Sequence, residues 1–477
     1  HYNHFLSILT LVNNHKMKKL LRNTLSCYHG QRWNKRGQNV TSKHVDLFEY
    51  ISVTDEKKQK LRQNSWATIE GDIPLDKTFN GQILEIYSKD RSNYTHGFHK
   101  FPAKYIPEIP RWAIVKFSKK ENKILDPFCG SGTTNVEARL HSRYSYAIDV
   151  DPIALLLTKV KTTPLNEKEL QRAKNWLLRA IYTSQDAKIP EFPNRDYWFR
   201  SDVLNDLGVI TKHIHMIENP DLRDFFTVCL SSILKEVSNA DPKFLYALAI
   251  SKKMRRQNNR QIDAKKTFAQ KVKELTPKMI AFSRKCPKDY FVKIIGKDAR
   301  EIELPNESID LAVTSPPYLN AVDYPRANQL QIFWLGLWKD KLSKLKKLYI
   351  GTEQVTAKEY MHPVRYGIPS LDEILEKIYQ VDKKRSYVVY KYFSEMRRNF
   401  LEVKRVLHCG GYYCVAVADN IVRKIPVPTH AVLMDIAQEV GFKTVDHFAS
   451  LLMMRPHNMR EAEKMSAEWV MVFQKED

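Results

Sequence analysis

The segment TSPPY at 314–318 follows an apolar run, SIDLAV at 308–313, that predicts a buried strand. Proline cannot donate a hydrogen bond within a sheet, so the strand must end where the two prolines begin. Proline also fixes its own φ and restricts the preceding residue to extended geometry. The Ser315 hydroxyl and the Pro316 carbonyl are therefore predicted to form a rigid pair of hydrogen-bond acceptors. Tyr318 adds an aromatic ring beside them.

A second segment, DPFCGSGTT at 126–134, joins a short apolar run to a helical pattern. Its glycines let the backbone turn tightly and let a ligand come close. The turn is not the GxGxxG dinucleotide fingerprint, because Asn135 stands in the last position, and it lacks the GKS or GKT of a Walker loop. The strand predicted at 144–150 ends in Asp149, which could accept hydrogen bonds from both hydroxyls of a ribose. An ordinary strand-to-helix turn with a surface Asp is the alternative.

Strand, turn, helix and strand at this spacing form a βαβ unit, which implies a parallel sheet. The alternation pauses at 166–289, where the pattern is mostly helical, and strands resume after 290. We expect an α/β fold with an open, doubly wound, mixed sheet of about seven strands, whose insertions emerge at the strand ends where ligands bind. The expected strands span 122–128, 144–150, 290–299, 308–313, 411–419, 448–454 and 468–475.

Composition favours a nucleic-acid partner. The 477 residues include 77 Lys and Arg against 54 Asp and Glu, a formal net charge of +23. This excess indicates a polyanionic partner, although a membrane surface or a solubility effect would also account for it. Six scattered cysteines without a CxxC pair exclude a zinc ribbon and fit a reducing cytoplasm. We expect no metal site at the isolated HxxH of His96 and His99, and no membrane span.

Three segments are candidates for contact with nucleic acid. The run KKMRRQNNR at 252–260 has five cations in nine residues, but a solvated helix end would look the same. The lysines of 341–347 are equally ambiguous. Arg326, with Asp323 and Tyr324, follows TSPPY closely and fits a substrate loop, although helix capping and surface pairing explain these residues as well. The predicted contact residues are Lys252, Lys253, Arg255, Arg256, Arg260 and Arg326.

DPFCGSGTT, AIDVDP and TSPPY, in this order, resemble the S-adenosylmethionine-dependent amino-methyltransferases of DNA. The Ser-Pro-Pro-Tyr tetrad is most similar to that of the N4-cytosine group, and the motif order looks like the gamma arrangement. HGFHKFPAKYIPEIP at 96–110 also looks like the segment that such enzymes place beside the cofactor. The resemblance covers roughly 95–165, 290–335 and 390–475, and it implies the Rossmann-like class I methyltransferase fold.

The resemblance implies roles for individual residues. Asp126, Phe128, Gly130, Gly132 and Thr133 would shape the methionine end of the S-adenosylmethionine pocket, Asp149 would hold the ribose, and Asp298 would lie near the adenine amino group. The catalytic tetrad would be Ser315, Pro316, Pro317 and Tyr318. The cytosine amine is a poor nucleophile, and acceptors aimed at its hydrogens would draw its nitrogen toward tetrahedral geometry. Tyr318 would stack on the flipped base.

The predicted organisation follows from these motifs. Residues 1–84 would form a basic appendage, 85–165 the cofactor-binding half, 166–289 a helical insertion and candidate DNA-recognition region, and 290–477 the catalytic half with a second insertion at 339–387. We expect double-stranded DNA as the partner, together with a cognate restriction endonuclease, in the cytoplasm of a prokaryote and associated with its nucleoid. N6-adenine methylation of DNA, N2-guanine methylation of RNA, and a catalytically silent DNA-binding subunit remain open.

Overall fold

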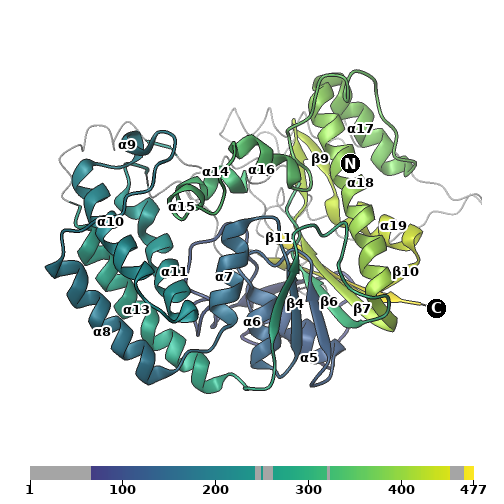
Figure 1. Cartoon of the computed structure of the whole chain (residues 1–477). Coiled ribbons are helices and arrows are strands. Elements are labelled where there is room, and N and C mark those ends of the chain that lie inside the picture. Colours follow the sequence, from purple (N-terminus) through teal and green to yellow (C-terminus); the bar gives the residue numbers. More distant parts are fainter. Residues whose placement is uncertain (1–65, 242–248, 251–261, 320–322, 452–466, 477) are drawn as a thin grey trace, which may run out of the picture. The chain divides into compact units, whose positions relative to one another are not determined.

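The computed structural model describes residues 66–241, 249–250, 262–319, 323–451 and 467–476 (Figure 1). The basic run predicted to contact DNA, Lys252–Arg260, lies outside these residues. None of the described helices is long and apolar enough to cross a membrane.

The described chain is built around one large sheet, and all seven strands expected from the sequence are in it. They are β3 (Lys123–Asp126), β4 (Tyr144–Ile148), β5 (Val292–Gly296), β6 (Ile309–Thr314), β7 (Leu407–Val417), β10 (Phe442–Leu451) and β11 (Ala467–Lys475). Their order is β10-β11-β7-β6-β3-β4-β5. Within this set, β11 is antiparallel to both neighbours and the remaining pairs are parallel. The predicted doubly wound, mixed α/β fold is therefore confirmed.

Two further strands, β1 (Trp66–Glu70) and β2 (Gln82–Tyr87), extend the sheet beyond β10, so that it has nine strands in the described residues. The prediction that 1–84 forms an appendage is therefore wrong for residues 66–84. Leu84 and Ile86 are buried together with Trp112 of the helix α5 (Glu108–Phe117). The strand β2 pairs with β10 over three residue pairs and with β1 over five.

Successive residues of the central strands point to opposite faces of the sheet, as the period of a strand requires. Ile124 of β3 and Val313 of β6 pack with α5 on one face. Leu125 and Ala312, their neighbours in sequence, pack on the other face in a cluster that includes α18 (Lys383–Val406) and α19 (Thr429–Val440). Burial on both faces explains why these strands appear as continuous apolar runs in the sequence.

The helical insertion predicted at 166–289 is present beside the sheet (Figure 1). Leu170, Phe226 and Phe268 come from three of its helices and share a buried cluster with Leu157 of α7 (Pro152–Thr162). This cluster joins the insertion to the half of the domain that carries the glycine turn. The described helices of the insertion are α8 (Glu167–Thr183), α9 (Arg195–Trp198), α10 (Ser201–His215), α11 (Pro220–Val237) and α13 (Ala264–Lys285).

The second predicted insertion, 339–387, is less separate than the sequence suggests. It contains α16 (Leu342–Leu348) and α17 (Pro369–Val381), but its predicted end falls inside α18, which begins at Lys383. Leu371 and Leu375 of α17 belong to the same buried cluster as the strands β6 and β7. The helix α17 is therefore part of the domain core. The small hairpin of β8 (Asn420–Val422) and β9 (Ile425–Val427) follows β7.

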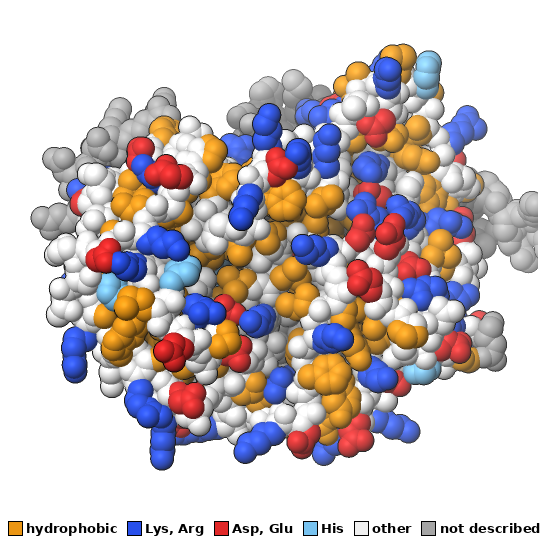
Figure 2. All heavy atoms as spheres, in the orientation of Figure 1, with side chains coloured by type: hydrophobic (Ala, Val, Ile, Leu, Met, Phe, Trp, Pro, Cys, Tyr) orange, Lys and Arg blue, Asp and Glu red, His pale blue; other side chains and the backbone are white. Residues whose placement is uncertain are grey.

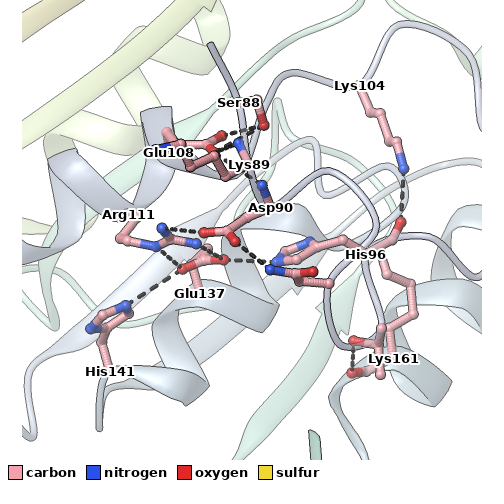
Figure 3. A network of polar contacts seen from close by, with 12 residues as sticks. Ser88, Lys89, Asp90, His96, Lys104, Glu108, Arg111, Glu137, His141 and Lys161 are labelled. Atoms are coloured by element: carbon pink, nitrogen blue, oxygen red, sulfur yellow. Dashed lines mark hydrogen bonds and ion pairs between the residues drawn. The ribbon is translucent and has the colours of Figure 1, made fainter. Parts of the chain in front are cut away.

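A buried ionic network holds the segment before α5 against α6 (Thr133–Leu140) (Figure 3). Glu137 of α6 lies 2.7 Å from His96 Nε2 and accepts a hydrogen bond from Arg111 Nε at 2.9 Å. Arg111 also donates to Asp90 at 2.7 Å. Burial alone would raise the pKa of Glu137, but His141, His96 and Arg111 outweigh that effect and hold it well below its usual range. The network thus fixes the path of residues 90–111.

The strands β3 and β6 lie side by side at the point where the strand order reverses. The chain proceeds from β3 through β4 to β5 in one direction, and from β6 to β7 in the other. Loops that leave the carboxyl ends of two such strands diverge and leave a crevice between them. The glycine turn follows β3 and the TSPPY segment follows β6, so the fold brings the two predicted motifs to one crevice.

Candidate active site

A cavity that opens to solvent lies at this crevice, where ligands bind in folds of this kind. Its wall combines the glycine turn, the end of β4, the residues that follow β5, part of the tetrad, and two segments at 101–105 and 348–350. Seven predicted site residues line it, namely Phe128, Gly130, Thr133, Asp149, Asp298, Ser315 and Pro317. Four others, Asp126, Gly132, Pro316 and Tyr318, do not.

Asp126 and Gly132 support the cavity from behind its wall. Asp126 is buried and accepts hydrogen bonds from Thr314 Oγ1 at 2.6 Å and from the amide of Phe128 at 3.2 Å. Burial raises the pKa of Asp126 to about 6. Gly132 has φ +75°, and a Cβ there would lie 2.8 Å from Thr158 Oγ1 of α7. The glycine therefore permits a left-handed turn and the close packing of α6 on α7.

Asp149 holds the glycine turn in place. One carboxylate oxygen accepts from the Gly130 amide and the other from the Asp151 amide, each at 2.8 Å. Burial raises the pKa of Asp149 to about 7. Each oxygen has a second lone pair, so the carboxylate can also accept from ligand hydroxyls. Asp151 is more fully engaged, because it caps α7 through Ile153 and accepts from Asn328 Nδ2 at 2.9 Å.

Asp298 follows β5 and lines the same cavity as the glycine turn. Arg300 donates to it from Nε at 2.8 Å and from Nη2 at 2.9 Å, and the third nitrogen of Arg300, Nη1, donates to Glu395 at 2.7 Å. Burial alone would raise the pKa of Asp298, but the hydrogen bonds from Arg300 outweigh it and lower the pKa. The carboxylate therefore stays ionised at neutral pH and is held at the cavity wall by its own arginine.

Two lysines beside the cavity were missed by the sequence analysis. Lys104 lines the cavity and donates to the His96 carbonyl at 2.7 Å, and burial lowers its pKa to about 8. Lys161 is 1% exposed and donates to the Ser131 carbonyl in the glycine turn. Among the described residues, neither ammonium group forms an ion pair with a carboxylate. The FPAK sequence before the turn was the available signal for Lys104; Lys161 looks like an ordinary residue of an apolar helix.

The hydroxyl of Ser131 adds to this pattern. It is buried at the cavity and has no hydrogen-bond partner in the part of the chain that the structure describes. Burying ammonium groups without a counter-charge is costly, as is burying an unpaired hydroxyl. A ligand carboxylate near Lys104 and Ser131 would relieve both costs. S-adenosylmethionine carries an α-carboxylate on its methionine part and two ribose hydroxyls on its adenosine part, so these residues and Asp149 fit its two parts.

The tetrad is only partly turned toward the cavity. Ser315 and Pro317 are half-buried on its wall, whereas Pro316 and Tyr318 are buried. The Tyr318 hydroxyl donates to Glu468 Oε1 of β11 at 2.5 Å, and the Ser315 hydroxyl lies 3.5 Å from the Tyr318 oxygen. Glu468 is a further residue that the sequence did not reveal. The predicted stacking of Tyr318 on a base remains a prediction, because its ring does not line the cavity.

The residues that follow the tetrad were interpreted either as a substrate loop or as helix-capping and surface-pairing residues, and the structure supports a different interpretation for different residues. Asp323 caps α14 (Tyr324–Ala327) through the Arg326 amide at 3.2 Å and pairs with Lys346, as the capping alternative expects. Tyr324 instead lines the cavity and stacks on Phe101 at a centroid distance of 6.1 Å. Arg326 is exposed and lines a second, shallower hollow of about 760 Å³, together with Asn194, Tyr197, Trp198 and Gln329.

Each of the two histidines of the HxxH sequence contacts a side chain from a neighbouring helix. His96 contacts Glu137, as described above, and His99 Nε2 lies 3.1 Å from Ser231 Oγ of α11. Burial lowers the pKa of His99 to about 4, so its ring is neutral at physiological pH. Both residues tie the cavity segment at 101–105 to the helices around it.

The chain is similar in sequence to known DNA methyltransferases. A family model of N6- and N4-type enzymes, described as DNA methylase, matches residues 11–159. The chain is 27% identical over 387 residues to the Type II methyltransferase M.MvaI of Kocuria varians, covering 75% of this chain and 84% of that protein. It is 26% identical over 425 residues to M.BsoBI of Geobacillus stearothermophilus, covering 77% of this chain and 82% of that protein.

The matches among solved structures include a putative DNA modification methylase from Thermus thermophilus in complex with S-adenosyl-L-methionine. The match has 20% sequence identity and a TM-score of 0.21, and it covers 38% of this chain and 54% of that chain. A methyltransferase from Methanosarcina mazei matches with 10% identity and a TM-score of 0.28, over 76% of this chain and 96% of that chain.

The raised pKa of Asp149 predicts pH-dependent cofactor binding. Only the ionised carboxylate is free to accept from both ribose hydroxyls while it keeps its two backbone contacts, so affinity should rise as pH increases through about 7. Calorimetry with S-adenosylhomocysteine from about pH 6 to about pH 8 measures this, with Asp149→Asn as the comparison. The substitution should weaken binding and flatten its pH profile; an Asn variant with the profile of the unmodified protein would contradict the assignment.

Because Lys104 has no carboxylate partner among the described residues, we predict that it binds the carboxylate of the ligand. Lys104→Met should weaken binding of S-adenosylhomocysteine about 10- to 100-fold, the usual effect of losing one charged hydrogen bond. Binding of 5′-methylthioadenosine, which lacks the amino-acid carboxylate, should change far less. Lys100→Met, an exposed lysine of the same segment, is the matched control. Equal losses for both ligands would show that Lys104 only maintains the shape of the cavity.

Proposed function

We propose that this chain, a member of the N4/N6 amino-methyltransferases of DNA that use S-adenosylmethionine, methylates the exocyclic N4 amine of cytosine in duplex DNA. The observation that carries the choice of base is the Ser-Pro-Pro-Tyr tetrad, whose Ser315 lies on the wall of the cofactor cavity. A neutral hydroxyl stands where adenine and guanine enzymes usually have Asp or Asn. Ser at this position is a tendency of cytosine enzymes, and the product assay below tests it.

The proposed mechanism uses the Ser315 hydroxyl, which lines the cavity, and the carbonyl of the buried Pro316 next to it. When bound, S-adenosylmethionine supplies an electrophilic methyl group on a sulfonium sulfur. Ser315 Oγ and the Pro316 carbonyl accept the two hydrogens of the cytosine amine, which localises its lone pair on nitrogen. The prolines hold the acceptors rigidly, so little reorganisation is needed as the nitrogen attacks in line. The amine that gains the methyl group would release one proton to solvent, since the cavity opens to solvent.

The cofactor is held by the residues described above. In this proposal Asp149 binds the ribose, Asp298 lies near the adenine amino group, and Lys104 with Ser131 binds the carboxylate. Phe128, Gly130 and Thr133 form the wall beside the methionine end. Asp126 and Gly132 act from behind the wall, by bonding to Thr314 and by packing against Thr158.

DNA contact requires cations near the cavity mouth. Lys and Arg side chains are spread over the face seen in Figure 2, with hydrophobic side chains between them, so charge alone does not single out one patch. The hollow that contains Arg326 is a better candidate. It combines a guanidinium, the amides of Asn194 and Gln329, and the exposed ring of Tyr197, which are groups that contact phosphates, base edges and unstacked bases.

This hollow joins the helical insertion to the segment after the tetrad. Phe192, just before α9, stacks on Phe333 of α15 (Gln329–Trp334) at a centroid distance of 6.0 Å. DNA held in the hollow would therefore be gripped by both parts of the chain. The relatives named above are Type II methyltransferases, and by that likeness we infer a companion restriction endonuclease for this chain too.

Two alternatives differ in the product. Adenine N6 methylation of DNA would use the same cavity and the same acceptor pair, and RNA guanine methylation would need a different polynucleotide. A silent DNA-binding subunit is disfavoured by two groups at the cavity: Lys104 has no carboxylate partner and the Ser131 hydroxyl no hydrogen bond among the described residues, and a protein that binds no cofactor has no reason to retain them.

The first test of the function is the identity of the product. Duplex DNA methylated by this protein should yield N4-methylcytosine on digestion and mass spectrometry. Ser315→Ala should lower turnover about 10²- to 10³-fold, because one preorganised acceptor is lost, while cofactor affinity stays unchanged. A label on adenine N6 would overturn the choice of base and leave the fold and cofactor site standing. A label found only on RNA would overturn the DNA substrate.

The second test addresses the Arg326 hollow. Arg326→Glu should weaken DNA binding and reduce the slope of log affinity against log salt by about one, because at least one phosphate contact is lost. Arg398→Glu makes the same change in net charge on α18, where Arg398 is exposed and pairs with Glu301. Fluorescence anisotropy across a salt series compares them. Equal effects of the two substitutions would mean that only net charge matters and that the hollow does not bind DNA.

A further inference from the structure

The polar groups behind the tetrad form a chain of three residues. The Ser315 hydroxyl lies 3.5 Å from the Tyr318 hydroxyl, which in turn lies 2.5 Å from Glu468 Oε1. Tyr318 is 6% exposed and Glu468 is 4% exposed, so water does not compete freely for these contacts. Glu468 stands at the start of β11, 150 residues from Tyr318 in sequence.

When Glu468 is ionised, these hydrogen bonds have a fixed direction, because the carboxylate has no proton to donate. An ionised carboxylate only accepts hydrogen bonds. The Tyr318 hydroxyl must therefore donate its single proton to Glu468, and toward Ser315 it offers only lone pairs. The Ser315 hydroxyl can then donate its proton to the Tyr318 oxygen. In that orientation the lone pairs of the Ser315 oxygen point away from Tyr318. Since Ser315 lines the cavity, those lone pairs are available to a group bound there.

We infer that Glu468 is a positioning residue for methyl transfer, which acts through Tyr318 to present the Ser315 hydroxyl as an acceptor to the amine of the target base. The inference rests on the proposed function, in which Ser315 accepts an amine hydrogen. Without this chain the hydroxyl proton of Ser315 would be free to point into the cavity, where it would oppose an N–H group. The separation of 3.5 Å is long for a hydrogen bond and is expected to shorten when the base is bound.

Tyr318 has two roles in this proposal, and substitutions can separate them. Its ring is the predicted stacking surface for the flipped base, and its hydroxyl is the link between Ser315 and Glu468. Tyr318→Phe removes the link and keeps the ring, whereas Tyr318→Ala removes both. Burial raises the pKa of Glu468, while the Tyr318 hydroxyl and the charge of Arg91 lower it, so the assays belong at alkaline pH, where the carboxylate is ionised.

The experiment compares Tyr318→Phe, Glu468→Leu and Glu468→Gln, alone and combined with Ser315→Ala, in the full chain. The readouts are kcat, KM for duplex DNA, cofactor affinity, and base flipping followed with 2-aminopurine beside the target. Tyr318→Phe and Glu468→Leu should each lower kcat about 3- to 10-fold, the usual effect of one hydrogen bond. KM, cofactor affinity and flipping should stay unchanged. Glu468→Gln should recover most of the loss, because its amide oxygen still accepts from Tyr318.

In the Ser315→Ala background, neither Tyr318→Phe nor Glu468→Leu should lower kcat further, because the group they orient is gone. Tyr413→Phe is the matched control, since Tyr413 is also buried and its hydroxyl contacts Asn399 at 2.7 Å behind β7. It should cost thermal stability and leave kcat unchanged. This comparison separates a loss of orientation from a general loss of buried polar contacts.

Three results would overturn the inference. They are an unchanged kcat in Tyr318→Phe, a loss in Glu468→Gln as large as in Glu468→Leu, and a further loss on adding Glu468→Leu to Ser315→Ala. The second would indicate that Glu468 must carry charge or take up a proton rather than orient a hydroxyl. Failure of the proposed function has a different signature: Ser315→Ala itself would keep full turnover, or the product would not be N4-methylcytosine.

Discussion

The hydrogen bond from Thr314 to Asp126 joins two residues that are 188 positions apart in sequence, and the active site depends on it. Asp126 ends β3 and Thr314 ends β6, so this bond sets the glycine turn and the tetrad side by side. Asp126 also accepts from the Phe128 amide, which fixes the first step of the turn. Because both groups are buried, loss of either would leave an unpaired polar group in the sheet. The reversal of strand order between β3 and β6 opens the crevice above this bond.

Around that crevice the protein buries more charge than it neutralises. Lys104 and Lys161 have no carboxylate partner among the described residues, Ser131 has an unpaired hydroxyl, and burial raises the pKa of Asp149 to about 7. Elsewhere in the described structure, a buried charge such as Glu137 is surrounded by partners (Figure 3). The contrast marks the cavity as a place whose polar groups are completed by a ligand. The ligand's ribose and carboxylate ends match the acidic and basic sides of the cavity.

Peripheral parts of the chain act on the cavity by holding its wall segments. The Glu137 network fixes residues 90–111, and this segment supplies Phe101, Lys104 and Tyr105 to the wall. The helical insertion packs on α7 and meets the segment after the tetrad at α15, so it lies next to the hollow proposed for DNA. From the other half of the sheet, β11 supplies Glu468 to the buried end of the tetrad. Each contact is between segments distant in sequence, which is why the site tolerates a long insertion between its two halves.

The sequence by itself determined the seven central strands, the glycine turn, Asp149 and the tetrad, because these are written in local signals: apolar runs, punctuating glycines and prolines, and an acid at a strand end. Only the tertiary structure decided what lies behind them. It moved Asp126 and Gly132 from the cavity wall to its support, added β1 and β2 to the sheet, and identified Lys104, Lys161 and Glu468. A buried lysine in an apolar helix and a glutamate at the start of a strand resemble ordinary surface residues in sequence. The roles proposed for these residues depend on their burial and on their partners in other segments. A local sequence pattern shows neither the burial nor the partners.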